Sequence, residues 1–387
     1  MANLGYIQMV RHCNQNCGFC SNPETPFFYD LEQYRTIIDD FAARGYFGVV
    51  LTGGEPTLSP VLPEAIAYAR SRDLHVRLIT NGQKMADAVY TKTLIDAGLQ
   101  HVHLSLHTHR AKVEDFLTGT PGSLRWAEQA LDHLGASPVV VNLNTVINRY
   151  NCDHLHETVD WMLDRFPYIR HVVWNNLDPS IGRAAANTFF TARLRDLEYS
   201  LALAMRRLHD SGRTFRVERV PLCYMTDFAH CSTETRKIVK GEERIVHFLD
   251  DKGTVRQTAW GHLYADVCTT CSLRLICGGL FDRGDAYDPA ELSPVYLDPR
   301  PIVQRIVQDE ASDPSWRPDP ARLALLVPAA APRPAHPSAP DGSRLVQPST
   351  DPRRRHDPEA RDWQPIAEAA KDAAVGDGAL AGPRRPG

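Results

Sequence analysis

Short apolar runs alternate with amphipathic stretches over the first 212 residues, and this rhythm constrains the fold more than any other feature of the chain. The candidate strands, rich in β-branched residues, lie at residues 5–10, 47–51, 75–79, 102–106, 139–147 and 171–175. The amphipathic stretches lie at residues 31–44, 61–72, 85–97, 123–134, 155–165 and 191–209. Six β-α repeats predict an α/β fold in which helices cover a parallel sheet. Six units are too few to close an eight-stranded barrel.

Three cysteines follow the first predicted strand with the spacing C-x3-C-x2-C. They are Cys13, Cys17 and Cys20, and the next cysteine is Cys152. Thiolates suit iron–sulfur chemistry, and four of them normally complete a [4Fe–4S] cluster. Three thiolates would leave one iron with an open coordination position for a substrate or cofactor. A zinc site with three thiolates and a water is the alternative that the spacing leaves open.

A second motif, Thr52-Gly53-Gly54-Glu55-Pro56-Thr57, follows the second predicted strand. The two glycines free backbone groups to face a ligand, and the Glu55 carboxylate can accept hydrogen bonds from an ammonium group. A Gly-Gly pair alone would indicate only a turn. Its position after a strand, together with the cysteine motif, favours a ligand site and the iron–sulfur interpretation.

The two motifs together resemble those of the radical S-adenosylmethionine (SAM) superfamily. The resemblance implies an open, TIM-like (β/α)6 partial barrel with its cluster loop after the first strand. It also implies that SAM chelates the open iron and is cleaved by one electron to a 5′-deoxyadenosyl radical. The residues that it assigns are Cys13, Cys17 and Cys20 for the cluster, Phe19 for the SAM adenine, and Gly53, Gly54 and Glu55 for the SAM amino group. Phe19 has a core position as its alternative.

Polar residues end the later strands, where similar enzymes contact SAM or the substrate. We expect Ser105 and Asn144 to contact SAM, with Asn142 as a further candidate. Asn81, after the third strand, is expected either to contact SAM or to cap the following helix. In the Gly-Arg-Ala turn after the sixth strand, Arg183 either holds a carboxylate or belongs to a structural turn.

Histidines crowd the fourth predicted strand, where alternation puts His101, His103 and His107 on the same face as Ser105. Histidines two residues apart on a strand rarely bring all their rings to one ion. We therefore expect polar side chains that line the barrel mouth rather than a metal site. His107 remains a candidate substrate contact or proton donor.

Five further cysteines lie between residues 223 and 277, and three of them have the spacing C-x2-C-x5-C. This pattern resembles the auxiliary-cluster portion of the SPASM and shorter twitch extensions of radical SAM enzymes. Phe281 stands where the SPASM pattern continues with a cysteine. The resemblance implies a second [4Fe–4S] cluster, for which we expect the ligands Cys268, Cys271, Cys277 and, as the fourth, Cys223 rather than Cys231. Structural zinc is the alternative.

The sequence divides into three regions. Residues 1–212 are the expected radical SAM core, and residues 213–310 a small Cys-rich α+β auxiliary domain. That domain would contain short antiparallel strands at residues 215–220, 244–249 and 255–259, with the turn between the last two at Asp250-Asp251-Lys252-Gly253. Residues 311–387 hold half of the 28 prolines and predict a disordered tail with a short helix around residues 366–374.

Charge and hydropathy exclude several classes of protein. The formal net charge of −4 offers no broad basic surface for nucleic acid. Residues 1–12 lack the apolar core of a signal peptide, and no apolar run predicts a membrane span. Nine cysteines without a secretory signal favour metal ligation in a reducing cytoplasm over disulfides, and we assign the isolated Cys152 a structural role.

The resemblance implies hydrogen abstraction from a ribosomally made peptide or a specialised metabolite, assisted by the auxiliary cluster. It implies a flavodoxin- or ferredoxin-type electron donor. Because only twelve residues precede Cys13, we expect no fused N-terminal peptide-recognition domain. A peptide substrate stays open, since such a domain can be a separate protein. The alternatives are a tRNA-modifying or methylating radical SAM enzyme and a non-catalytic iron–sulfur or zinc protein. The missing basic patch argues against an enzyme that acts on tRNA. A non-catalytic protein would give no role to Glu55 or to the open iron.

Overall fold

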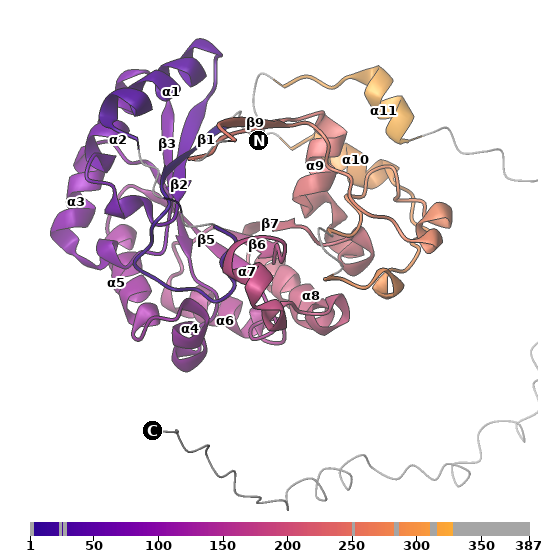
Figure 1. The fold of residues 1–387 in the computed structure, drawn as a ribbon. Coiled ribbons are helices and arrows are strands. Elements are labelled where there is room, and N and C mark those ends of the chain that lie inside the picture. The colour runs from indigo at the N-terminus through magenta and orange to yellow at the C-terminus, as the bar shows by residue number, and fades with distance from the viewer. Residues whose placement is uncertain are drawn as a thin grey trace, which may run out of the picture. The chain divides into compact units, whose positions relative to one another are not determined.

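The predicted strands of the first 212 residues form one sheet. A computed structural model describes residues 4–22, 25, 29–249, 252–281, 286–309 and 316–327, and its sheet has the strand order β7-β6-β5-β4-β3-β2-β1-β8-β9. The six strands expected from the sequence are β1 (Leu4–Val10), β2 (Gly48–Gly53), β3 (His75–Thr80), β4 (His101–Ser105), β5 (Val140–Ile147) and β6 (His171–Asn176). Consecutive members of this set pair in parallel (Figure 1). Among the described strands β7 and β9 do not pair, so the predicted open parallel α/β sheet is confirmed.

Three later strands extend the same sheet at both edges. β7 (Thr214–Glu218) pairs in parallel with β6, so the expected antiparallel strand at residues 215–220 was wrong. The reason is that helix α8 (Leu194–Asp210) connects β6 to β7, and a helical crossover returns the chain in the same direction. β8 (Arg244–His247) and β9 (Thr254–Gln257) form the predicted antiparallel hairpin, and β8 also pairs in parallel with β1.

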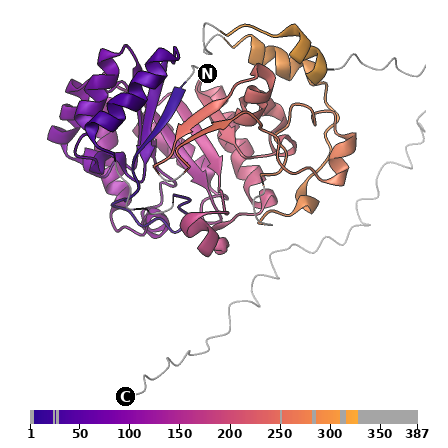
Figure 2. The same ribbon diagram turned by 45° about the horizontal axis from the view of Figure 1, so that its top comes forward.

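Helices cover one face of the sheet (Figures 1 and 2). They are α1 (Leu31–Ala43), α2 (Leu62–Ser71), α3 (Ala88–Asp96), α4 (Ala111–Thr118), α5 (Ser123–Gly135), α6 (Leu155–Arg165) and α8. Helix α1 begins with a capping box, in which the Asp30 side chain accepts from the Gln33 backbone N–H and the Gln33 side chain accepts from that of Asp30. The core lies between these helices and one side of each strand, for example Ile7 and Met9 of β1.

The opposite face of the sheet, which we call the lumen face, is only partly buried. In β1, β3 and β6 fully buried residues alternate strictly with half-exposed ones over most of the strand. An ion pair spans this face: the Arg244 guanidinium on β8 lies 3.1 Å from the Glu218 carboxylate on β7, although these two strands are not neighbours in the sheet. The sheet therefore curls until side chains from its two halves meet.

The Cys-rich segment after β7 is built from short elements. They are the 3-10 helices η4 (Leu222–Tyr224), η5 (Thr226–Cys231) and η6 (Asp266–Thr270), with the α-helices α9 (Thr233–Lys240) and α10 (Arg300–Val307). This segment lies in one compact unit with the sheet, and that unit extends to residue 329. The domain boundary at residue 212 stays a prediction.

Part of the expected disordered tail is ordered in the structure. Residues 320–326 form helix α11 (Pro320–Leu326), with proline in the first turn, where its missing N–H does no harm. The Asp319 side chain caps this helix, and the Arg322 guanidinium donates to the Ile238 carbonyl at 2.8 Å. The helix expected around residues 366–374 lies outside the described residues, as does most of the tail.

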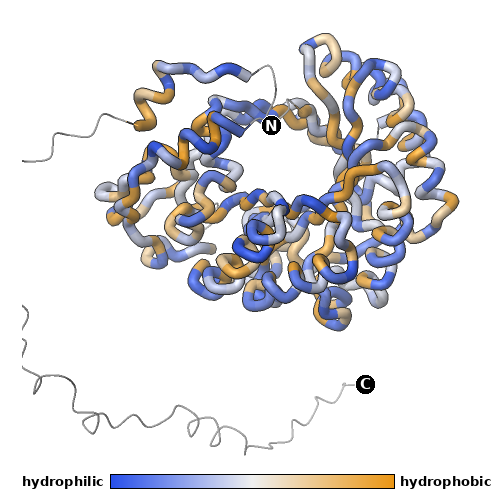
Figure 3. The backbone as a smooth tube through the Cα atoms, turned by 180° about the vertical axis from the view of Figure 1, so that it is seen from behind, coloured by the Kyte–Doolittle hydropathy of each residue, from blue (hydrophilic) through white to orange (hydrophobic). Residues whose placement is uncertain are grey.

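Polar and apolar residues alternate along the chain in Figure 3, without long uninterrupted apolar segments in the described helices. In the part of the chain that the structure describes, each helix is too short or too polar to cross a membrane.

Candidate active site

The three N-terminal cysteines lie in the loop that leaves the carboxyl end of β1, as predicted. Backbone N–H groups point at two of the sulfur atoms: that of Gln15 is 3.4 Å from Cys13 Sγ, and that of Asn22 is 3.4 Å from Cys20 Sγ. Burial raises the pKa of the Cys17 thiol well above its usual value, and the nearby Cys20 and Cys13 raise it further. Burial and negative charge on the neighbouring Cys20 thiolate also raise the pKa of Cys13, so these thiols need positive charge between them to ionise together.

Helix α4 holds one side of this cysteine loop. Its last carbonyl groups, those of Leu117 and Thr118, accept hydrogen bonds from the backbone N–H groups of Gly18 (3.1 Å) and Asn16 (2.9 Å). Helix carbonyls at this end lack partners within the helix. The carboxyl end of α4 therefore serves as a rigid support for the cysteine loop.

The short helix α7 (Gly182–Ala186), which follows β6, holds the other side. The Arg183 guanidinium donates to the Cys17 carbonyl at 2.8 Å, and the Ala184 N–H donates to the Cys20 carbonyl at 3.1 Å. Gly182 has φ +63°, and a Cβ atom there would lie 2.6 Å from the Cys20 carbonyl oxygen. The Gly-Arg-Ala turn thus fixes the backbone of the cysteine loop.

The two glycines of the second motif lie against the start of the cysteine loop. The Gly54 N–H donates to the Val10 carbonyl at 2.6 Å, and the Glu55 N–H donates to the His12 carbonyl at 3.0 Å. A Cβ atom at Gly54 would lie 2.1 Å from the His12 carbonyl oxygen, and one at Gly53 would lie 2.3 Å from that of Val10. Close backbone approach is therefore what requires glycine here, and the SAM contact stays a prediction.

The Glu55 carboxylate is buried and accepts four hydrogen bonds within the protein. Its donors are the Thr57 N–H (3.1 Å) and hydroxyl (2.6 Å), the Thr80 hydroxyl (2.7 Å) and the Asn81 N–H (2.8 Å). Burial raises the pKa of Glu55, while these donors lower it. The side chain thus ties the end of β2 to the end of β3, and a contact with the SAM ammonium stays a prediction.

Asn81 connects β3 to the cysteine loop. Its Nδ2 donates to the Asn14 side chain at 2.8 Å and lies 3.7 Å from Cys13 Sγ. Its Oδ1 accepts from the Gln83 N–H at 3.0 Å. The following 3-10 helix, η2 (Lys84–Ala86), has Gln83 as its N-cap and no side-chain cap, so the capping role expected for Asn81 was wrong. Asn81 instead closes the turn after β3 and positions the loop near Cys13.

Phe19 is 4 % exposed and lies in a small apolar cluster with Leu117 and Phe190. Its ring and the His107 imidazole lie nearly perpendicular, at a centroid distance of 4.8 Å. Burial lowers the pKa of His107 to about 4, so the ring is neutral, and its Nδ1 accepts from the Val146 N–H at 3.2 Å. The described structure gives Phe19 a core position, and its contact with adenine stays a prediction.

Ser105 and Asn144 are register partners on β4 and β5, so the side chains expected at SAM lie side by side on the lumen face. Asn142 and His103 form the next pair on this face toward the amino ends of the strands. Asn175 of β6 was missed: its Nδ2 donates to the Asn144 side chain at 2.7 Å. Alternation along β6 puts Asn175 on this face, but only the register shows that it reaches Asn144.

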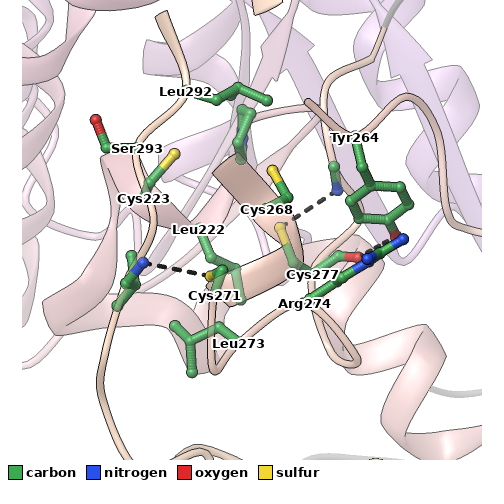
Figure 4. A pocket seen from close by; sticks show the side chains of 13 residues that line it. Leu222, Cys223, Tyr264, Cys268, Cys271, Leu273, Arg274, Cys277, Leu292 and Ser293 are labelled. Atoms are coloured by element: carbon green, nitrogen blue, oxygen red, sulfur yellow. Dashed lines mark hydrogen bonds between the residues drawn. The ribbon is translucent and has the colours of Figure 1, made fainter. Parts of the chain in front are cut away.

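Four cysteines line one pocket in the Cys-rich segment (Figure 4). They are Cys223, Cys268, Cys271 and Cys277. Backbone N–H groups again point at sulfur: that of Val295 is 3.3 Å from Cys271 Sγ, and that of Gly279 is 3.3 Å from Cys277 Sγ. Burial raises the pKa of the Cys277 thiol to about 11.

Cys231 does not line this pocket in the described structure. It is buried, and the charges nearest its thiol are those of Arg216 and Arg236. The isolated Cys152 is also buried, and its thiol donates to the Arg149 carbonyl at 3.6 Å. All nine cysteines are free thiols. The pocket therefore groups the fourth cysteine that we expected, Cys223, with the C-x2-C-x5-C set.

Residues 7–162 match the protein family described as the Radical SAM superfamily. These residues form a Radical SAM domain. It is 28 % identical over 167 residues to a PqqA peptide cyclase of Xanthomonas euvesicatoria, covering 41 % of this chain and 45 % of that protein. It is 33 % identical over 214 residues to an Fe-coproporphyrin III synthase of Methanosarcina barkeri, covering 53 % and 52 %. The chain thus spans about half the length of the curated relatives that it matches.

Solved structures share the fold of this chain. Streptococcus suis SuiB bound to S-adenosylmethionine aligns with a TM-score of 0.56 at 16 % identity, over 76 % of this chain and 78 % of that chain. SuiB bound to its precursor peptide SuiA aligns with a TM-score of 0.50 at 15 % identity, over 64 % and 58 %. At such identities these likenesses show the fold alone.

The radical SAM family implies a [4Fe–4S] cluster and SAM, and both cysteine groups have donor sets suited to iron–sulfur chemistry. Each thiolate of such a cluster binds a different iron, so the ligands surround a volume rather than converge on one point. Within the described residues, no three His, Cys, Asp or Glu side chains converge on a single metal ion. Thiols close to backbone N–H groups, as found in both groups, are the arrangement that iron–sulfur sites use to tune the cluster.

Proposed function

We propose that this radical SAM protein cleaves SAM reductively and abstracts hydrogen from a peptide or a specialised metabolite. Cys13, Cys17 and Cys20 would hold the [4Fe–4S] cluster and leave one iron open for SAM. A cluster held by these cysteines would supply the one electron with which SAM is cleaved to methionine and a 5′-deoxyadenosyl radical. The observation that carries the proposal is the three-thiol loop at the carboxyl edge of the sheet, fixed by α4, α7 and the Gly53–Gly54 turn.

The residues around the loop would hold SAM and keep it in register with the substrate. Ser105 and Asn144 offer polar groups on the lumen face, and Asn175 orients the Asn144 amide. Phe19 lies within the cysteine motif and would pack against the adenine. Gly53 and Gly54 would leave backbone groups free to face the SAM amino group, while Glu55 braces β2 against β3.

A second [4Fe–4S] cluster would occupy the pocket lined by Cys223, Cys268, Cys271 and Cys277. Four cysteines are enough to bind every iron of such a cluster. A fully ligated cluster suits the transfer of an electron from a substrate radical rather than the binding of substrate to iron. Structural zinc remains the alternative occupant.

A peptide substrate has the support of the relatives, several of which are named PqqA peptide cyclase. The relative named Fe-coproporphyrin III synthase has the higher identity over a longer stretch, so a tetrapyrrole is a second candidate substrate. We also propose a flavodoxin- or ferredoxin-type electron donor, a separate peptide-recognition protein and a cytoplasmic location. The free cysteines support a reducing compartment.

The test is anaerobic reconstitution of the full chain, followed by iron and sulfide counts and an assay for 5′-deoxyadenosine with SAM and dithionite. We expect about eight irons per chain and formation of 5′-deoxyadenosine. Cys17→Ala should abolish the product, whereas Cys152→Ala, at a buried cysteine outside both groups, should retain it. About four irons with product still formed would mean that the second pocket holds zinc or no metal.

Reaction with substrate separates the remaining alternatives. Peptides encoded next to the gene, a coproporphyrin and unmodified tRNA would each be added to the reduced enzyme with SAM. A peptide that gains or loses mass together with 5′-deoxyadenosine supports the first candidate. No 5′-deoxyadenosine from a loaded, reduced enzyme under any of these conditions would contradict the catalytic proposal and favour a non-catalytic iron–sulfur protein.

A further inference from the structure

The lumen face of the sheet carries polar side chains that the proposed SAM site does not use. By alternation, Tyr6 of β1, Arg77 of β3 and His103 of β4 point to this face, opposite the helices. Each of them is half-exposed, whereas their strand neighbours on the helix side are buried. Solvent therefore reaches this face, and a ligand that replaced the solvent would contact these side chains.

Three strands place an arginine on this face, and two of the three are paired with carboxylates. Arg244 on β8 lies 3.1 Å from Glu218, and Arg216 on β7 lies 3.3 Å from Asp309. For Arg77 the described residues provide no hydrogen bond and no ion pair, and its Nε is a buried atom without a partner. Arg77 is thus a fixed positive charge on the lumen face without a protein anion.

The side chains near Arg77 are neutral rings rather than acids. Burial, together with the lesser effect of the Arg77 charge, lowers the pKa of His101 to about 2 and that of His103 to about 3. His101 is 8 % exposed, and its Nε2, like that of His75, is a buried nitrogen without a partner. Neutral imidazoles with free ring nitrogens can donate to an anion, and no described acid near Arg77 would repel one.

Burial also lowers the pKa of the Arg77 guanidinium, because the charge has been taken out of water without a partner. A bound carboxylate would remove this penalty and accept two parallel hydrogen bonds from the planar group. Phosphate-sized and carboxylate-sized anions both match this geometry. No described lysine is among the groups that act on the pKa of Arg77, and a site without a second positive charge favours the smaller single charge.

The depth of Arg77 fits a substrate group. Arg77 precedes Thr80, the last residue of β3, by three residues, so its Cα lies about 10 Å below the carboxyl edge of the sheet. The cysteine loop and the Ser105–Asn144 pair lie at or near that edge. An anionic group held at Arg77 would therefore direct the rest of the same molecule upward, toward the atoms that react.

We propose that Arg77, with His101 and His103 beside it, binds a carboxylate of the substrate inside the barrel. This inference rests on the proposed function, because it takes the lumen face as the substrate side of the SAM site. It narrows the substrate to a molecule with a carboxylate placed away from the carbon that reacts, such as an acidic side chain or the carboxyl terminus of a peptide.

The experiment measures binding of succinate to the reconstituted full-length protein by calorimetry and by the shift in melting temperature at constant ionic strength. Succinamide, of the same shape without charge, is the matched ligand control. We expect saturable binding of succinate and none of succinamide. Arg77→Gln should weaken succinate binding at least about tenfold, because it removes a charge-assisted hydrogen bond. Arg165→Gln, at an exposed arginine paired with Asp132, should bind succinate as the wild type does.

Three results would overturn the inference: equal binding of succinamide, unchanged binding in Arg77→Gln, or no binding by the wild type. If Arg77→Gln does not fold, Arg77→Lys replaces it, because lysine keeps the positive charge but lacks the planar guanidinium. The affinity of this variant for succinate must then be lower than that of the wild type. The 5′-deoxyadenosine assay on the same preparation separates the two proposals. Succinate binding without SAM cleavage would contradict the proposed function alone, and cleavage without selective succinate binding would contradict this inference alone.

Discussion

The carboxyl group of Glu114 on α4 lies buried beneath the loop that follows β4. One oxygen accepts from the backbone N–H groups of His107 (3.1 Å) and Thr108 (2.9 Å). Burial nevertheless raises the pKa of Glu114 to about 8 from its ordinary 4.5. Between these two values the folded protein keeps a proton that the unfolded chain has released, so the contribution of Glu114 to stability is lost as the pH rises toward 8.

Glu114→Gln should remove this pH dependence, because the amide oxygen can accept both hydrogen bonds and carries no charge. We expect the melting temperature of the variant to exceed that of the wild type by an amount that grows between pH 5 and pH 8. Glu64→Gln, at an exposed carboxyl group of α2, should show no such trend. A constant difference across this pH range would mean that Glu114 is already ionised in the fold.

At Gly54 the addition of a single Cβ atom should affect both stability and cluster binding. A Cβ atom there would lie 2.1 Å from the His12 carbonyl oxygen, so Gly54→Ala must move the backbone that leads into the cysteine loop. We expect a loss of about 1–3 kcal/mol in unfolding free energy together with lower iron content after reconstitution. Gly45→Ala, which has φ +72° but meets no atom within 4 Å, should lose stability without losing iron. Equal iron content in both variants would show that the close contact between Gly54 and the His12 carbonyl does not matter for cluster binding.

At the scale of elements, the Glu218–Arg244 pair joins β7 to β8, two strands without backbone pairing. Burial favours protonated Glu218, but Arg244 and Lys237 outweigh it and hold the pKa of this carboxyl below its usual value. The pair therefore contributes stability at neutral pH that is lost as the pH falls through the pKa of the folded state.

Glu218→Gln should destabilise the protein by about 1–3 kcal/mol in urea unfolding, because it removes the carboxylate that pairs with the half-buried Arg244 guanidinium. The double variant Glu218→Leu/Arg244→Met should recover much of this loss, since no unpaired charge remains. Arg165→Ala, which breaks the exposed pair with Asp132, should cost less than about 1 kcal/mol. A loss in Glu218→Gln no larger than that of Arg165→Ala would show that the pair is solvated.

At the scale of the whole molecule, the Cys-rich segment has a pocket of four thiols where a larger domain would have more core. A bound cluster should therefore stabilise the entire unit that this segment shares with the sheet. We expect Cys268→Ala to lower both the iron count, by about four, and the melting temperature of the reconstituted protein. Cys231→Ala, at a buried cysteine outside the pocket, should keep the full iron count. Iron lost from the Cys231 variant instead would identify that residue as the fourth ligand.

Local sequence patterns were sufficient to predict most of the strands and helices of the fold. The six strands of the core could be predicted because each combines β-branched residues with a flanking amphipathic helix, and both signals are local in the sequence. The pairing of β7 and β8 with this sheet could not be predicted, because strand direction and partner depend on how the connecting chain crosses the molecule. Asn175, Glu114 and Arg77 were missed as site residues for the same reason: each depends on register or burial.

The sequence by itself determined where the cysteines and glycines of the predicted chemistry stand, because the loop after β1, the glycine pair after β2 and the second cysteine set are short motifs with a characteristic spacing. Only the tertiary structure shows which further cysteine lies in the pocket with the second set. Cys223 and Cys231 are eight residues apart, yet the chain turns through η4 and η5 so that Cys223 faces the pocket and Cys231 faces Arg216 and Arg236. The tertiary structure also shows that Arg77 forms no ion pair with a described carboxylate. Ion pairs on this face join residues that are far apart in the sequence, so they depend on how the chain folds.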